Sequence, residues 1–172
     1  KLVDAKKWDV GGLVDVMFGT DANFIHSNGI EIQTPGDNPG EVPQVDLVQA
    51  YVDVNAPVGN GLKIRVGKFA TLLGTETIDP RGNAFYSHSY LFSLIPFTQT
   101  GVLGFYQLNE QWSFVAGMTR GWDQATEDNH GAVDALGQVG YTMNKQIQFY
   151  LNLSVGPQDT SDTSHCRTTI EP

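Results

Sequence analysis

The sequence predicts an all-β protein, an antiparallel up-and-down transmembrane β-barrel, with this chain forming a partial barrel of about seven or more strands. Candidate strands alternate apolar and polar residues, which places them on opposite faces of a sheet. Long acidic loops and very short turns alternate between these strands, as in barrels assembled from one side of a membrane. No apolar run reaches the length that a membrane helix requires.

Periodicity places the strands in order along the chain. The candidate strands are Trp8–Phe18, Val45–Asn55, Leu62–Ala70, Gly101–Leu108, Trp112–Gly121, Ala135–Thr142 and Gln146–Val155. The second, fourth and sixth of them are each followed by a short turn, and the others by long connections. A β-sandwich has no reason to place every short turn at one end, so the pattern favours a barrel.

The last candidate strand shows the alternation most clearly. Ile147, Phe149 and Leu151 share an apolar face suited to hydrocarbon, whereas the intervening residues are polar and suited to water. Applied to all strands, this alternation predicts the residues that line a lumen: Asp9, Asp15, Asp53, Lys63, Arg65, Gln146, Gln148, Tyr150 and Asn152.

Three basic residues stand close together in the third candidate strand. Lys63 and Arg65, on its polar face, could bias a lumen toward anions, or could pair with Asp9, Asp15, Asp46 or Asp53 and stabilise a polar interior. Lys68 has the opposite parity near a strand end, so we expect its amine to extend to the membrane interface.

The second long connection, from Thr71 to Thr100, contains a segment too apolar and aromatic to be free in water. It could fold into the barrel mouth and narrow the pore, or form a short helical lid, or contact a neighbouring barrel. The residues that would form the constriction are Phe85, Tyr86, His88, Tyr90 and Phe92.

Aromatic residues near strand ends form a candidate girdle at the membrane interfaces. These residues are Trp8, Phe18, Phe69, Trp112, Trp122 and Phe149. The alternative is that they are ordinary core or hairpin aromatics.

Composition restricts the function classes. The 172 residues fit one domain spanning 1–172, and a mean hydropathy of −0.22 suits a barrel in which only alternate residues meet lipid. A net charge of −9 without a basic patch argues against nucleic acid. No enzyme signature is present, and we expect no cofactor, except that Asp123, Glu127 and Asp128 could supply oxygen ligands to Ca²⁺.

Seven is an odd strand number and low for a barrel, and another strand should begin near Thr169, where the chain stops. Open sheet edges are costly in a bilayer, so we expect that more of the barrel is missing, disordered or supplied by other chains. The start at Lys1, without Met or a signal segment, suggests a mature product or an excised fragment.

The chain also resembles the β-barrel porin family of planctomycete-type outer membranes. The resemblance extends from about Trp8 to about Gly156 and rests on short glycine and aromatic landmarks: Val45–Val52, Val66–Phe69, Thr75-Glu76, Asn83, Tyr86-Ser87, Ser89-Tyr90, Pro96-Phe97, Thr100–Val102, Gly117, Gly121–Asp123 and Gly140–Thr142. It implies an outer-membrane barrel of unproven pore function whose relatives are longer than this chain.

These observations predict a porin-like barrel in a bacterial outer membrane that lets small hydrophilic solutes diffuse passively. Its partners would be the lipid bilayer, those solutes, and further copies of the chain or other outer-membrane or surface proteins. The alternative is a structural barrel with a plugged lumen whose loops bind neighbouring subunits or a surface layer. A soluble glycan-binding β-sandwich would explain the low hydropathy but not the connection pattern.

Overall fold

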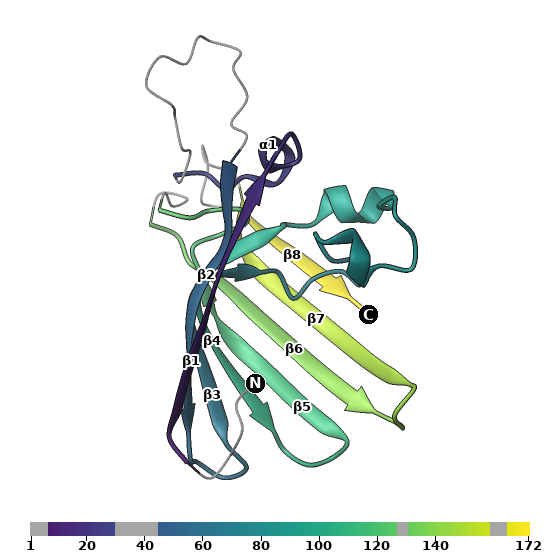
Figure 1. The fold of residues 1–172 in the computed structure, drawn as a ribbon. Helices are drawn as coiled ribbons and strands as arrows, with labels where there is room; N and C mark the ends of the chain where they lie inside the picture. Colours follow the sequence, from purple (N-terminus) through teal and green to yellow (C-terminus); the bar gives the residue numbers. More distant parts are fainter. Residues whose placement is uncertain (1–6, 30–44, 127–130, 159–164) are drawn as a thin grey trace.

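One antiparallel sheet forms the whole fold of the computed structural model, which describes residues 7–29, 45–126, 131–158 and 165–172 (Figure 1). Its eight strands lie in chain order from β1 to β8. They are β1 (Asp9–Phe18), β2 (Val45–Ala56), β3 (Leu62–Ala70), β4 (Thr98–Gln107), β5 (Trp112–Thr119), β6 (Asp134–Thr142), β7 (Gln148–Pro157) and β8 (Cys166–Glu171). The predicted all-β, up-and-down fold class is confirmed.

Helical structure is confined to the connections. The short helix α1 (Ala22–Ile25) follows β1, and the 3₁₀ helices η1 (Pro80–Gly82) and η2 (Tyr90–Leu94) lie between β3 and β4. In the described part of the chain no helix is long and apolar enough to cross a membrane.

Three strand predictions need correction. The segment Cys166–Glu171 forms β8, paired with β7, although we expected a further strand only near Thr169. The fourth strand begins at Thr98 rather than Gly101, so the second long connection is shorter than predicted. Gln146 lies in the turn before β7 and not on a strand.

The alternation of connection lengths holds throughout the sheet. The turns 57–61, 108–111 and 143–147 lie at one end, and the described parts of the four longer connections leave the strands at the other end (Figure 1). Each short turn closes a hairpin between neighbouring strands, so the sheet needs no crossover.

The strand register gives each face a distinct composition. Val52, Val66, Val102 and Met118 are neighbours in β2 to β5, and their side chains are between 47% and 66% exposed. Phe149, Leu151 and Leu153 of β7 are also exposed. We call this apolar face the outer face, and the opposite face, on which residues 71–97 lie, the inner face (Figure 1).

The hydrophobic core lies on the inner face, under the beginning of that long connection. Phe69, Leu103, Val115 and Leu136 form it, and Leu72 packs against them. Two of the predicted girdle residues are therefore wrong: Phe69 is fully buried in this core, and the Trp122 indole donates a hydrogen bond to Ser154 Oγ at 3.2 Å. Trp8, Phe18, Trp112 and Phe149 are exposed at strand ends.

Glycines allow neighbouring backbones to approach closely at one level of the sheet. Gly67 of β3 is paired with Gly101 of β4, and Gly67 has a φ of 134°. A Cβ atom at Gly67 would collide with the Ala50 carbonyl oxygen, so this close strand approach requires glycine.

The sheet curls but does not close. β1 pairs with β2 and β8 pairs with β7, and no pairing joins β1 to β8 within the described residues (Figure 1). The described strands thus form part of a barrel wall with two edges.

Candidate functional site

The inner face is crossed by a cluster of charges at β2 and β3. Arg65 donates two hydrogen bonds to the Asp53 carboxylate, from Nε at 2.8 Å and from Nη2 at 2.9 Å. The Lys63 amine lies 3.8 Å from the same carboxylate. The predicted pairing with Asp53 is therefore present, but one carboxylate serves two cations, so this cluster keeps a net positive charge.

Aromatic rings hold both cations in place. The Arg65 guanidinium lies 3.6 Å from the centroid of the Tyr51 ring, and the Lys63 amine lies 4.0 Å from that of Phe105. Cation–π contacts of this kind stabilise a charge without neutralising it. Because Lys63 and Arg65 stay partly accessible, the inner face presents positive charge at this level.

The other predicted lumen residues on strands lie on β1, one edge strand, and on β7, next to the other edge strand β8. Asp9 and Asp15 lie on β1, where the Gln49 amide donates to the Asp15 carboxylate at 3.4 Å. On β7, the Tyr150 hydroxyl donates to Gln148 at 3.0 Å.

Asn152, also on β7, is buried and accepts a hydrogen bond from Gln138 Nε2 at 2.7 Å. Gln146, in the turn, is not part of this row. The predicted residues therefore occupy both margins of the inner face, with the hydrophobic core between them.

Residues 71–97, which we call the crossing segment, run over the inner face. At one point the Gly74 amide donates a hydrogen bond to the Glu171 carboxylate of β8. At another, Ile78 and Pro80 border a cavity whose opposite wall includes Asp15 of β1. The segment leaves β3 and thus reaches residues of both edge strands.

Internal hydrogen bonds fix the shape of the crossing segment. The Asp79 carboxylate accepts hydrogen bonds from the Arg81 side chain and amide, which lower its pKa to about 2. Ser89 donates from its amide and hydroxyl to the Glu76 carboxylate and lowers the pKa of that group. Such local pairing orders the segment without contributions from the sheet.

The structure separates the five predicted constriction residues. Phe92 is buried, and its ring stacks on His88 with centroids 3.8 Å apart. Phe85, Tyr86 and Tyr90 are exposed on the segment. One aromatic therefore anchors the segment, while the other three rings are exposed on its surface.

Hydrogen bonds from two other connections hold the beginning of β4 in place. Asp123 Oδ1 accepts hydrogen bonds from the amides of Phe97 and Thr98, at 2.8 and 2.9 Å, and Ser27 Oγ lies 2.6 Å from the Thr98 hydroxyl. Asp123 itself has a left-handed φ of 51°. We call these contacts the mouth clasp. They join the connections after β1 and β5 to the start of β4, at the end of the sheet that carries the longer connections.

Burial raises the pKa of the Asp123 carboxyl to about 6, against the lowering effect of the two amide bonds. This carboxylate was a predicted Ca²⁺ ligand together with Glu127 and Asp128, which lie outside the described residues. No group of three or more His, Cys, Asp or Glu side chains suited to a metal occurs in the described part. In this structure Asp123 joins backbone segments.

Sequence reasoning missed a buried ion pair between β2 and β3. Lys68 Nζ lies 3.6 Å from Asp46 Oδ2, and the two side chains are only 3% and 1% exposed. Lys68 also donates to the Leu47 carbonyl oxygen at 2.5 Å. The expected extension of Lys68 to the interface is therefore wrong, and no spacing in the sequence signals this pair.

An open, curled antiparallel sheet with an apolar outer face and a charged inner face is the wall of an outer-membrane-type β-barrel. The family model described as "Putative beta-barrel porin-2, OmpL-like" matches residues 2–171. The chain belongs to this family, which confirms the predicted porin-type resemblance. Searches of curated proteins and of solved structures gave no match to this chain.

Proposed function

We propose that the protein is a porin through which small hydrophilic solutes diffuse passively across a bacterial outer membrane. The observation that carries the proposal is the contrast between the two faces. Valine, leucine, phenylalanine and methionine side chains are exposed on the outer face, whereas charged and amide side chains gather on the inner face. That contrast suits lipid outside and water inside.

Selection in such a pore would depend on size and charge. The Asp53, Lys63 and Arg65 cluster supplies one net positive charge, which favours anions at that level. The crossing segment would narrow the space over the inner face, because it is bonded to Glu171 of the edge strand β8 and borders a cavity beside the other edge strand, β1. No catalytic step is part of this proposal.

A sheet with two open edges needs partners in a bilayer. Unpaired backbone groups there cost several kcal/mol each. We propose that further strands, from additional sequence or from other copies of the chain, complete the wall.

The crossing segment also favours a second candidate function. Because it reaches residues of β1 and β8, it could block the lumen and leave a structural barrel whose loops bind neighbouring proteins. The two functions differ in one property, the passage of ions.

Single-channel recording of the full-length protein in a planar bilayer tests the proposal. A pore gives stable conductance steps that grow with salt concentration, with a selectivity that shifts toward cations in Arg65→Gln. Protease protection of the bilayer-embedded part shows whether the protein is inserted. An inserted protein that conducts no current would support the plugged barrel.

A further inference from the structure

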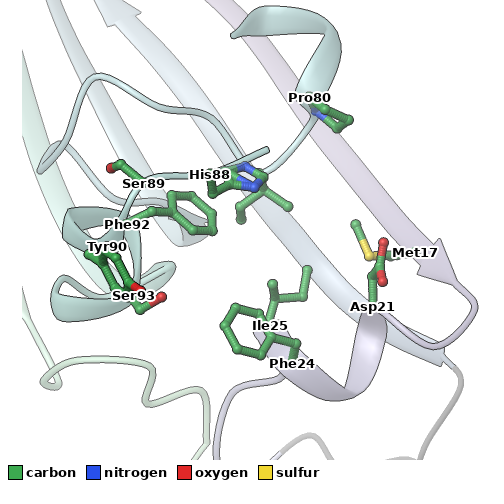
Figure 2. Close-up of a pocket in the computed structure, with 11 residues that line it drawn as sticks. Met17, Asp21, Phe24, Ile25, Pro80, His88, Ser89, Tyr90, Phe92 and Ser93 are labelled. Carbon is green, nitrogen blue, oxygen red and sulfur yellow. The ribbon is translucent and has the colours of Figure 1, made fainter. Parts of the chain in front are cut away.

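A cavity of about 410 Å³ lies between α1 and the crossing segment (Figure 2). Phe24 and Ile25 of α1 form one wall, and Tyr90 and Phe92 of η2 form the other. The volume lies within the range of small-molecule pockets, roughly 300–1,000 Å³. The cavity involves neither the Arg65 cluster nor the buried Lys68 pair.

Connected aromatic rings fix the geometry of this cavity. The Phe24 and Phe97 rings have centroids 5.3 Å apart, and Phe92 lies 5.0 Å from Phe97 and 3.8 Å from His88. The rings link the β1 connection to the crossing segment, so the two walls are held by packing. Rings in contact at these distances also present their faces and edges to whatever enters.

One carboxylate lines the cavity without a partner among the described residues. Asp21 precedes α1, yet its side chain does not cap that helix. Its carboxylate lies beside Met17 at the edge of the cavity (Figure 2). No lysine or arginine occurs among the described residues that line the cavity.

The electrostatics of these groups select one class of ligand. Aromatic faces carry negative potential and attract cations, and a carboxylate attracts them more strongly. Asp21 would repel an anion, and no lysine or arginine among the described lining residues offsets that repulsion. A purely hydrophilic cation would leave the rings uncovered. We propose that this cavity binds a small organic cation with an apolar or aromatic body.

The cation would sit with its charged group toward Asp21 and its apolar body against the rings of Phe24, Tyr90 and Phe92. Tyr90 is 94% exposed, so ligand binding would cover a ring that the protein itself leaves uncovered. Because the site needs no ion passage, it is independent of the pore proposal.

Calorimetric titration of the full-length protein in detergent micelles tests the site, with benzyltrimethylammonium as the probe. We expect saturable binding that empty micelles do not show. Phenylacetate tests the sign of the charge and glucose tests a neutral polar ligand, and neither should bind. Equal binding of phenylacetate or glucose would overturn the proposal, as would the absence of saturable benzyltrimethylammonium binding at millimolar concentration.

Two pairs of variants locate the site. Asp21→Asn should weaken the affinity about tenfold, whereas Glu110→Gln, in a turn at the other end of the sheet, should leave it unchanged. Tyr90→Ala should weaken it several-fold, whereas Tyr86→Ala removes an equally exposed ring that does not line the cavity.

Equal affinities within both pairs would overturn the assignment. If Asp21→Asn does not fold, judged by circular dichroism, the tyrosine pair decides the outcome. A protein that binds the cation but conducts no current would refute the pore and keep this site.

Discussion

The two faces of the sheet are built from the same strands and differ only in which alternate residue they receive. Leu151 is exposed on the outer face of β7, and its neighbour Asn152 is buried in a hydrogen bond on the inner face. This contrast explains how a mean hydropathy of −0.22 is compatible with a membrane-facing surface. It also shows that the amphipathic unit is the strand and not the chain.

The largest expected effect concerns a charge pair accessible from neither face. Lys68→Met leaves Asp46 buried without its ion-pair partner, so the free energy of unfolding should fall by about 3–5 kcal/mol. Urea unfolding of the protein refolded in lipid measures it, and the exposed Lys145→Met is the control. A loss as small as that of Lys145→Met would show that water reaches this pair. The pair would then belong to one of the two faces and not to the interior.

The second prediction tests the faces at adjacent positions of β7. Leu151→Arg places a charge on the outer face and should cost about 2–4 kcal/mol near the bilayer midplane. Tyr150→Arg, on the inner face, should cost much less. The same urea titrations measure both variants, and equal costs would break the assignment of faces.

The third prediction concerns Asp123 of the mouth clasp, which lies in a connection and therefore on neither face of the sheet. Because the folded protein holds the Asp123 pKa at about 6, above its usual value of 3.8, the folded state binds this proton more tightly than the unfolded state. The contribution of the Asp123 carboxyl to the free energy of unfolding therefore increases by about 1–3 kcal/mol as the pH falls from 7 toward 4.

Other carboxyl groups titrate in the same range, so the quantity to compare is the difference between wild type and Asp123→Asn at each pH. The asparagine keeps the acceptor oxygen but does not titrate. A pH-independent difference would contradict the burial of this carboxyl group.

The smallest expected effect on stability concerns the inner charge cluster. Arg65→Gln removes two charge-assisted hydrogen bonds to Asp53 and should cost about 1–2 kcal/mol, since the pair is only partly accessible. Arg81→Gln breaks an equally close but exposed pair with Asp79, and no measurable loss is expected there. Urea titrations measure both variants. A larger loss of unfolding free energy in Arg81→Gln than in Arg65→Gln would contradict this account.

Periodicity predicted the faces of β7 correctly because lipid-facing and inward-facing residues alternate there without interruption. It failed near Phe69 and Lys68, where the local alternation is intact but both side chains are buried. Phe69 shares its core with residues of three other strands, which are distant in sequence, and Leu72 of the crossing segment packs against this core.

Two strand predictions failed for a different reason. β8 alternates Arg167, Thr169 and Glu171 with only one strongly apolar residue, Ile170, so its amphipathic signal is weak. β4 begins with the buried polar residues Thr98 and Gln99, which lack the alternation of apolar and polar residues that located the other strands. The cavity beside Asp21 depends on packing between two connections, and no local pattern encodes it.

Thiol labelling at adjacent positions of β7 tests the central claim most directly. Tyr150→Cys and Leu151→Cys are made in a Cys166→Ser background, because Cys166 is exposed and would react. In proteoliposomes of the full-length protein, a charged water-soluble thiol reagent should label position 150 readily and position 151 hardly at all, because the reactive thiolate does not form in hydrocarbon. Equal labelling of both positions by the water-soluble reagent would contradict a barrel wall with water on one face and lipid on the other.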